Sequence, residues 1–196
     1  MPQTVNTIKL LHDQIRFYLP NPSFCIDATA GNGKDTLFLA RLVGESGKVL
    51  AMDIQEKAVC TTKELLEKKN LKDRVEVILD GHEHMDHYVK QGQVDCIMFN
   101  LGYLPGGNHK LATNFKTTIT AIQKGLDLLK PGGIISLAIY QGGDTGFEEK
   151  ECVLKWLKDL NCDLYTVMVT DFYNRPNYPP LAVFIIKEQS DDLKLQ

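Results

Sequence analysis

The alternation of short apolar runs with amphipathic stretches constrains the fold of this chain more than any other feature. The apolar runs predict seven strands, at residues 23–28, 48–53, 75–79, 94–100, 134–139, 164–170 and 181–187. The amphipathic stretches place apolar residues three and four positions apart, which predicts helices at residues 4–18, 34–43, 55–69, 115–129 and 148–160, with a shorter turn at 85–90. Such alternation is typical of an α/β fold with a mostly parallel sheet and helices on both faces.

The last two predicted strands break this alternation. Residues 171–180 between them are rich in proline and asparagine and leave no room for a crossover helix. The two strands should therefore form an antiparallel hairpin at the C-terminal end of a seven-stranded sheet. This arrangement resembles the Rossmann-like fold of class I methyltransferases. We expect one such domain over residues 1–189, followed by a polar tail at 190–196.

Composition narrows the class of protein further. With 43% hydrophobic and 24% charged residues, the 196-residue chain has the balance of a globular protein. Its longest apolar runs, at 134–140 and 181–186, fall far short of the ~20 residues that a membrane span requires. The N-terminal stretch lacks the basic start and apolar core of a signal peptide, so we expect a cytoplasmic protein with no membrane partner. The net charge of -3 provides no overall attraction to nucleic acid, although one face could still be basic.

A glycine-rich turn, DATAGNGKDT at residues 27–36, follows the first predicted strand and opens a helix. Ligands of doubly wound sheets bind at this edge, where glycine lets the backbone approach them closely. A triphosphate-binding loop is excluded because Ala28 stands where its first glycine is needed and Asp35 where Ser or Thr is needed. A dinucleotide site fits poorly, because after Gly31 and Gly33 the chain carries Thr36 where close helix packing calls for Gly or Ala.

A third cofactor class agrees better with the turn. Asp27 at the strand end, followed by the compact glycine turn, resembles the first motif of S-adenosylmethionine enzymes, in which an acidic residue lies near the methionine end of the cofactor. Asp53 ends the second strand, where a carboxylate can accept both ribose hydroxyls, as it also does in NAD sites. Gly81 and His82 follow the third strand, where this fold contacts adenine, and the Pro-Gly-Gly turn at 131–133 resembles one that many methyltransferases carry.

The segment after the fourth strand, NLGYLPGGNHK at residues 100–110, indicates the chemistry. It lies where nitrogen-directed methyltransferases carry an Asn-Pro-Pro-Tyr-like segment, which it resembles loosely. The carbonyl oxygen of Asn100 and the following backbone could hold an amino group with its lone pair aimed at the methyl group, and Tyr103 could stack on a splayed-out base. The alternative is a glycine- and proline-rich connecting loop. On the late loop, Arg175 or Tyr178 could contact substrate, or this loop is only a rigid proline turn.

Together, DATAGNGKDT, Asp-Ile-Gln at 53–55, NLGYLPGGNHK, the Pro-Gly-Gly turn and the late Asn-Tyr-Pro-Pro resemble a bacterial family long labelled rRNA methylases. Its members are associated with tRNA 5-(aminomethyl)-2-thiouridine methyltransferase activity. The resemblance implies methyl transfer from S-adenosyl-L-methionine to the aminomethyl nitrogen of a wobble uridine, with the anticodon region of tRNA as partner. Ribosomal RNA and a small amine stay open as other acceptors.

The resemblance, with the motifs above, assigns residues to two groups. The cofactor group is Asp27, Ala30, Asn32, Gly33, Asp35, Thr36, Asp53, Gln55, Gly81, His82 and Asn100. The substrate group is Leu101, Gly102, Tyr103, Lys110, Arg175 and Tyr178. The catalytic candidates are Asn100, Tyr103 and His12, the last because an alkylamine must lose a proton before it attacks. For a lone histidine on a helix, packing or capping is the alternative role.

One segment favours a different class of enzyme. His82, His84, Asp86 and His87 follow an apolar strand and resemble the zinc signature of metallo-β-lactamase-fold hydrolases, in which such residues hold metal ions that activate water. That fold needs further ligands downstream, and only His109 follows. The methyltransferase interpretation assigns no metal and expects His84 and His87 on an exposed helix. A catalytically silent RNA-binding module is a third hypothesis, and a homodimer is a further one, because so small a chain could pair with itself to enlarge its RNA surface.

Overall fold

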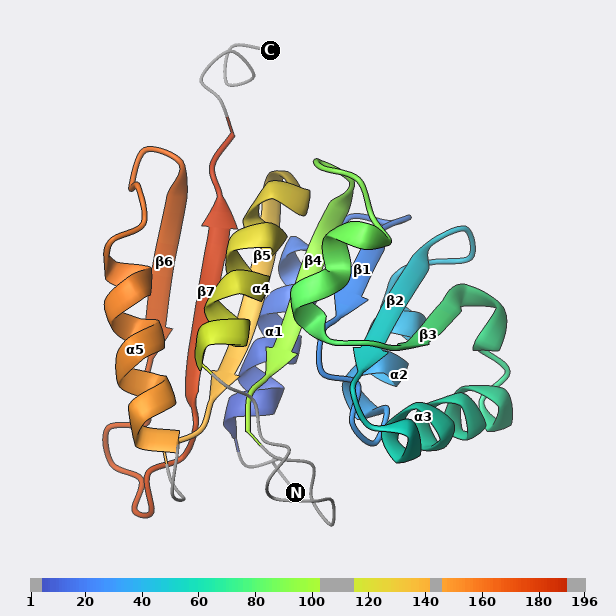
Figure 1. Ribbon diagram of the computed structural model, residues 1–196, viewed down its shortest axis with the longest axis horizontal. Coiled ribbons are helices and arrows are strands. Elements are labelled where there is room, and N and C mark those ends of the chain that lie inside the picture. Colours follow the sequence, from blue (N-terminus) through green and yellow to red (C-terminus); the bar gives the residue numbers. More distant parts are fainter. Residues whose placement is uncertain (1–4, 103–114, 142–145, 190–196) are drawn as a thin grey trace.

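The computed structural model describes residues 5–102, 115–141 and 146–189, with the side chains of 146–149 left aside. A seven-stranded sheet forms its centre, in the order β3-β2-β1-β4-β5-β7-β6 (Figure 1). The strands are β1 (Phe24–Asp27), β2 (Lys48–Asp53), β3 (Val75–Leu79), β4 (Val94–Asn100), β5 (Leu129–Ile139), β6 (Tyr165–Thr170) and β7 (Leu181–Lys187). The predicted seven strands and the α/β class are confirmed.

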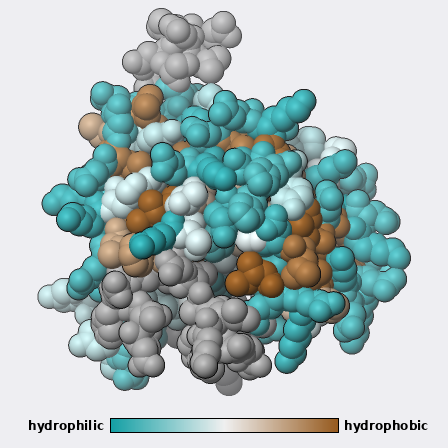
Figure 2. All heavy atoms as spheres, viewed as in Figure 1, coloured by the Kyte–Doolittle hydropathy of each residue, from teal (hydrophilic) through white to brown (hydrophobic). Residues whose placement is uncertain are grey.

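The helices cover both faces of this sheet (Figure 1). They are α1 (Thr7–Tyr18), α2 (Lys34–Leu42), α3 (Glu56–Lys68), α4 (Phe115–Leu128) and α5 (Gly146–Lys158), with short 3-10 turns η1 (Lys72–Arg74) and η2 (His82–His87). Asn6 starts α1 by accepting the backbone N–H of Lys9 at 2.8 Å. Most of the described face seen in Figure 2 is hydrophilic. No helix in the described ranges is long and apolar enough to cross a membrane.

Alternate side chains of the central strands enter two separate cores. Cys25 and Cys96 pack with residues of α1, α2 and α3, whereas their neighbours Ile26 and Ile97 pack with residues of η2, α4 and α5. This division follows from the period-two alternation of side chains along a strand. Strands buried on both faces need helices on both sides, which explains why their sequences are continuously apolar.

The C-terminal strands form the predicted antiparallel hairpin. β7 pairs antiparallel with β6 through Met168↔Phe184 and antiparallel with β5 through Ser136↔Phe184, so it lies between them. Residues 171–180, which connect β6 to β7, therefore open at the edge where β1, β2, β3 and β4 also end. This is the carboxyl edge of the sheet, and it carries the candidate site.

The start of the fifth strand differs from the prediction. β5 begins at Leu129, five residues earlier than expected, and it includes the Pro-Gly-Gly segment that was predicted as a separate turn. The pairing with β4 shifts register between Val94↔Leu129 and Cys96↔Ile134. Gly132 takes φ 79° there, a left-handed conformation that favours glycine. The segment is thus an irregularity within the strand, which composition alone cannot distinguish from a turn.

Candidate active site

The strand order reverses between β1 and β4, and we call the carboxyl edge at this reversal the crevice. The chain runs outward from β1 through β2 to β3 and then returns to place β4 on the other side of β1. In open α/β sheets, ligands bind at such a reversal because the loops on its two sides diverge. Asp27, Asp53 and Asn100 end the strands around it.

The glycine turn after β1 is held by backbone hydrogen bonds. Ala30 N–H donates to the Met52 carbonyl at 2.9 Å, and Gly33 N–H donates to the Ala30 carbonyl at 2.8 Å. Gly33 takes φ 75°, and a Cβ at this position would lie 3.0 Å from Thr62 Oγ1. Backbone conformation and close packing against α3 therefore both require glycine here.

The Asp27 carboxylate holds this turn through hydrogen bonds. Its side chain is buried and accepts hydrogen bonds from Thr36 Oγ1 at 2.5 Å and from the Thr29 N–H at 3.2 Å. Burial, followed by the negative charge of Asp35, raises the pKa of the Asp27 carboxyl to about 7. Asp27 therefore anchors the turn to the start of α2.

Asp53 connects the same turn to the end of β2. Its Oδ2 accepts the Gly31 N–H at 2.9 Å and its Oδ1 accepts the Gln55 N–H at 2.8 Å. Each carboxylate oxygen has a second lone pair, so the side chain can still accept the hydroxyls of a ribose. Ile54, directly after Asp53, is an apolar side chain that the structure leaves 54% exposed at this edge, and the sequence alone did not indicate this exposure.

His82 begins η2 directly beyond β3. Its ring is buried, packs edge-on against Phe99 with 5.8 Å between centroids, and its pKa is lowered chiefly by burial. Within the described chain, its Nε2 is buried without a hydrogen-bond partner. A neutral imidazole with one unsatisfied nitrogen can recognise the edge of a heterocycle such as adenine. The glycine turn, Asp53 and His82 together fit a nucleoside cofactor.

Asn100 is held on the opposite side of the crevice. Its backbone N–H donates to Thr29 Oγ1 at 2.7 Å, and its side-chain Nδ2 donates to Asp35 Oδ2 at 3.2 Å. The other oxygen of Asp35 lies 2.8 Å from His12 Nε2. The His12 ring stacks on Phe38 with 3.7 Å between centroids. Three predicted site residues from α1, α2 and β4 thus form one chain of contacts that we call the Asp35 cluster: His12, Asp35 and Asn100.

The Asp35 cluster leaves one group available for a ligand. The amide nitrogen of Asn100 donates a hydrogen bond to Asp35. In the described part of the chain, no donor is bonded to the amide oxygen of Asn100. That oxygen is a hydrogen-bond acceptor, which is the kind of group needed to hold an amine. Asp35, expected only beside a cofactor, instead contacts both catalytic candidates that the structure describes.

The histidine-rich segment forms a separate group, the Asp80 cluster: Asp80, His84 and Tyr88. His84 Nδ1 lies 2.7 Å from Asp80 Oδ1, and Tyr88 OH donates to Asp80 Oδ2 at 2.8 Å. The hydrogen bond between them lowers the pKa of Asp80 and raises that of His84. His87 stacks on His84, whereas Asp86 binds Lys124 at 2.8 Å.

These contacts disagree with the zinc interpretation. His82 is buried against Phe99, His84 pairs with Asp80 and Asp86 binds Lys124, so the four side chains do not converge on one point. Among the residues that the structure describes, no group of three or more His, Cys, Asp or Glu could hold a metal ion. The short 3-10 turn of η2 directs successive side chains to different sides, which the spacing in the sequence did not reveal.

The predicted substrate residues are divided. Leu101 is only 1% exposed and belongs to the core. A Cβ on Gly102, the next residue, would lie 3.5 Å from the ring of Tyr140. Tyr103 and Lys110 lie outside the described residues. Arg175 and Tyr178 lie on the exposed β6–β7 loop, with Tyr178 at φ 45° and 73% exposed.

The remaining predicted cofactor residues lie near the same turn or at neighbouring strand ends. Asn32 and Ala30 lie in the glycine turn, Thr36 binds Asp27, and Gln55 and Gly81 bind Asp53 and Asp80 through their backbone N–H groups. All five lie at the same carboxyl edge. The structure thus gathers the described cofactor candidates around one crevice, with His12 and Asn100 on its other side.

Comparisons with known proteins agree with this geometry. The family described as "Putative rRNA methylase" matches residues 49–186. The chloroplastic tRNA (mnm(5)s(2)U34)-methyltransferase of Arabidopsis thaliana is 38% identical over 174 residues, 84% of this chain. The match covers 63% of that relative, so the chain spans less than two thirds of its length.

Two solved structures are similar over nearly the whole chain. A "putative rRNA-methylase" from Clostridium thermocellum is 49% identical, with a TM-score of 0.91 over 94% of this chain and 99% of that one. A "putative methyltransferase" from Streptococcus mutans in complex with SAH is 41% identical, with a TM-score of 0.85 over 94% and 99% of the two chains.

Proposed function

The chain belongs to the rRNA methylase family, and from this premise we propose that it is an S-adenosylmethionine-dependent methyltransferase that acts on RNA. The observation that carries the proposal is the Asn100 side chain, whose amide nitrogen is bound by Asp35 so that its oxygen can accept a hydrogen bond at the cofactor crevice. The Streptococcus mutans relative binds SAH, which is what S-adenosylmethionine becomes after it has donated its methyl group.

The residues of the crevice would hold this cofactor. Asp53 would accept the ribose hydroxyls, His82 would face the adenine, and the backbone from Ala30 to Gly33 would lie against the methionine part. When bound, the cofactor supplies an electrophilic methyl group on a sulfonium. The protein then contributes chiefly orientation, which can lower a barrier by several kcal/mol when the reacting atoms are aligned.

We further infer that the acceptor is the aminomethyl nitrogen of 5-aminomethyl-2-thiouridine at the tRNA wobble position. The name of the Arabidopsis relative and the NLGYLPGGNHK segment support this choice. The Asn100 oxygen would accept one N–H of the amine and thereby direct the nitrogen lone pair toward the methyl group. In this proposal Asn100 contacts the acceptor directly, and Asp35 holds the Asn100 amide in place.

The amine must be neutral when it attacks, and the nitrogen that forms the new bond must release a proton afterwards. Asp35 contacts Asn100 on one side and His12 on the other. We assign to this pair the role of receiving the proton, directly or through water, with His12 also keeping the Asp35 carboxylate in place. Packing of His12 on Phe38 restricts its ring to the orientation that reaches Asp35.

Transfer of a labelled methyl group to bulk tRNA that lacks the modification tests the proposal. We expect nucleoside mass spectrometry to detect methylated aminomethyl-thiouridine, and Asn100→Ala to serve as the inactive control. Transfer to ribosomal RNA or to a small amine instead would keep the enzyme class and change the acceptor. Failure with all three acceptors, together with stoichiometric zinc in the same preparation, would favour the hydrolase.

Two further expectations accompany this function. A tRNA acceptor would agree with the cytoplasmic location expected from the sequence. A homodimer would enlarge the RNA-binding surface of this protein. A molar mass of 22.0 kDa, that of one chain, in size-exclusion chromatography with light scattering would argue against a homodimer.

A further inference from the structure

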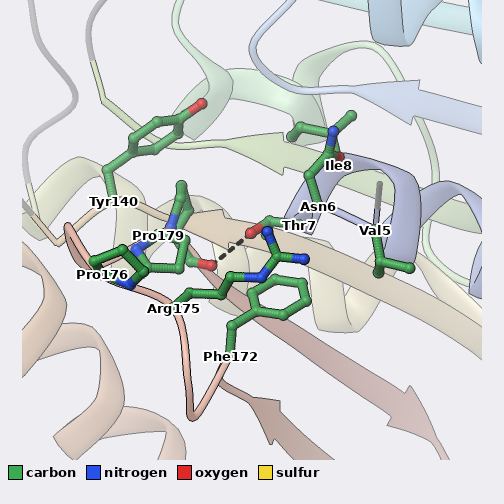
Figure 3. A pocket seen from close by; sticks show the side chains of 10 residues that line it. Val5, Asn6, Thr7, Ile8, Tyr140, Phe172, Arg175, Pro176 and Pro179 are labelled. Carbon is green, nitrogen blue, oxygen red and sulfur yellow. Dashed lines mark hydrogen bonds between the residues drawn. The ribbon is translucent and has the colours of Figure 1, made fainter. Parts of the chain in front are cut away.

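A pocket of about 410 Å³ lies at the carboxyl edge, beside the end of β5 (Figure 3). Its walls come from three segments that are distant in sequence: the start of α1, Tyr140 after β5, and the loop at 171–180 between β6 and β7. The volume is within the usual range for small-molecule sites. Neither the cofactor crevice nor the Asp35 cluster contributes to its lining.

Hydrogen bonds hold the loop that forms this pocket. Thr7 Oγ1 donates to the Pro180 carbonyl at 2.6 Å, and Gln141 Nε2 donates to the Pro179 carbonyl at 2.8 Å. Gln141 is itself bound by Lys150 Nζ at 2.7 Å. The prolines and these contacts restrict the loop before any ligand arrives, so binding would cost little ordering of the chain.

The lining suits a ligand in which a flat aromatic ring lies close to a negatively charged group. It is mainly apolar and includes the aromatic rings of Tyr140 and Phe172 together with prolines. Among the described residues that line it, Arg175 is the sole charged one, and its guanidinium carbon lies 5.9 Å from the centre of the Phe172 ring (Figure 3). Single-stranded RNA is recognised by such rings and by arginine, which stack on bases and bind phosphates.

The pocket also adjoins the acceptor side of the crevice. Leu101 N–H donates to the Ala138 carbonyl at 3.0 Å, which joins the end of β4 to the end of β5. Tyr140 follows β5 there, and its ring lies 3.5 Å from the position of a Cβ on Gly102. A nucleotide next to the one that presents its amine to Asn100 could therefore reach the pocket without a long gap.

We propose that this pocket binds a nucleotide that flanks the methylated one in the RNA, with its base against the Phe172 and Tyr140 side and its phosphate at Arg175. The proposal rests on the proposed function, because it assumes that RNA enters the crevice. It adds a second contact by which the enzyme would distinguish an RNA loop from a free nucleoside or small amine.

Two substitutions test the pocket against a matched control. Arg175→Gln and Phe172→Ala should each raise the Kd for an anticodon stem-loop about tenfold, consistent with the effect of removing one stacking or phosphate contact. The Kd for S-adenosylmethionine should stay unchanged, because the pocket shares no lining residue with the cofactor crevice. Arg41→Gln removes an exposed arginine in the last turn of α2, far along that helix from the carboxyl edge, and should leave the stem-loop Kd as in the wild type.

The outcomes separate this inference from the proposed function. An unchanged stem-loop Kd in both Arg175→Gln and Phe172→Ala would overturn the pocket assignment, even if methyl transfer to tRNA is normal. A tenfold weaker Kd in both variants would support it, even if the methylated product is not the expected nucleoside. Because Arg175 is exposed, Arg175→Gln should fold normally, and thermal unfolding checks whether Phe172→Ala does so.

Discussion

The Asp35 cluster and the Asp80 cluster contain the same pair of residue types at nearly the same distance, but in different environments. His12 lies 2.8 Å from Asp35 and His84 lies 2.7 Å from Asp80. The side chains of the first pair are 19% and 9% exposed, whereas those of the second are 44% and 27% exposed. Water screens the second pair, so its interaction contributes little to stability.

The two clusters also differ in how they are assembled. Asp80, His84 and Tyr88 lie within nine consecutive positions, so a local turn suffices to bring them together. His12, Asp35 and Asn100 come from three elements that meet only when the sheet and its helices have packed. A partly buried cluster that depends on tertiary structure can hold a side chain in one orientation, which is what a catalytic role requires. The comparison predicts that activity depends on the Asp35 cluster and not on the Asp80 cluster.

The largest effect should come from Asn100→Ala. It removes the oxygen that would hold the amine, and loss of one well-placed hydrogen-bonding group at a reaction centre lowers kcat by roughly 100-fold or more. The Kd for S-adenosylmethionine, measured by calorimetry, should change much less. If the single-turnover rate constant stays within about twofold of the wild type, Asn100 is not catalytic, and the Asp35 cluster has no greater role in activity than the Asp80 cluster.

Asp27→Asn should change the pH dependence of stability. The pKa of Asp27 is about 7 in the folded protein and 3.8 as the reference value, so the folded state binds the extra proton between these values. This group's contribution to the free energy of unfolding therefore decreases as pH rises from about 4 to about 7, with a slope of up to roughly 1.4 kcal/mol per pH unit. Denaturant unfolding of both proteins without cofactor measures the difference. A difference that is constant across this range would contradict the burial argument.

Asp53→Ala should weaken cofactor binding. The substitution removes the ribose acceptor and the partner of two backbone N–H groups. Hydrogen bonds to a charged group are worth about 1.5–3 kcal/mol, which corresponds to a rise of roughly 10- to 100-fold in Kd. Calorimetric titration with S-adenosylmethionine provides the value. Asp73→Ala is the control, because Asp73 lies in the η1 turn before the start of β3, at the end of that strand opposite the carboxyl edge. Equal Kd values for all three proteins would remove Asp53 from the site.

The smallest effects separate the two histidines directly. His12→Ala should lower kcat by about tenfold, because Asp35 loses a partner next to Asn100, and His12→Gln should recover part of the loss by restoring a donor. His84→Ala should leave kcat unchanged. Its pKa is raised by Asp80, so any stabilisation is present at low pH and lost as pH rises through the pKa of His84 in the folded protein. Parallel kinetics and melting curves at pH 5.5 and 8 measure both, and equal losses of kcat for His12→Ala and His84→Ala would show that the two clusters do not differ in function.

Much of the fold could be predicted because its signals are local. Each strand is a short apolar run, and each strand end at the crevice carries a polar residue, as Asp27, Asp53 and Asn100 show. The start of β5 was missed because an irregular strand and a turn use the same glycine and proline chemistry. The burial of Leu101 was not predicted either, because the sequence does not show which residues of the segment after β4 enter the core.

The sequence alone determined the class of fold, the edge that carries the site and the residues of the glycine turn, because strand periodicity and turn chemistry act over a few neighbouring residues. Only the tertiary structure decided that His12 and Asn100 meet at Asp35, and that His82 packs on Phe99 while His84 pairs with Asp80. It also placed Tyr140, Phe172 and Arg175 around one pocket. Contacts between residues that lie tens of positions apart depend on how helices pack against the sheet, and no short pattern in the chain records that packing.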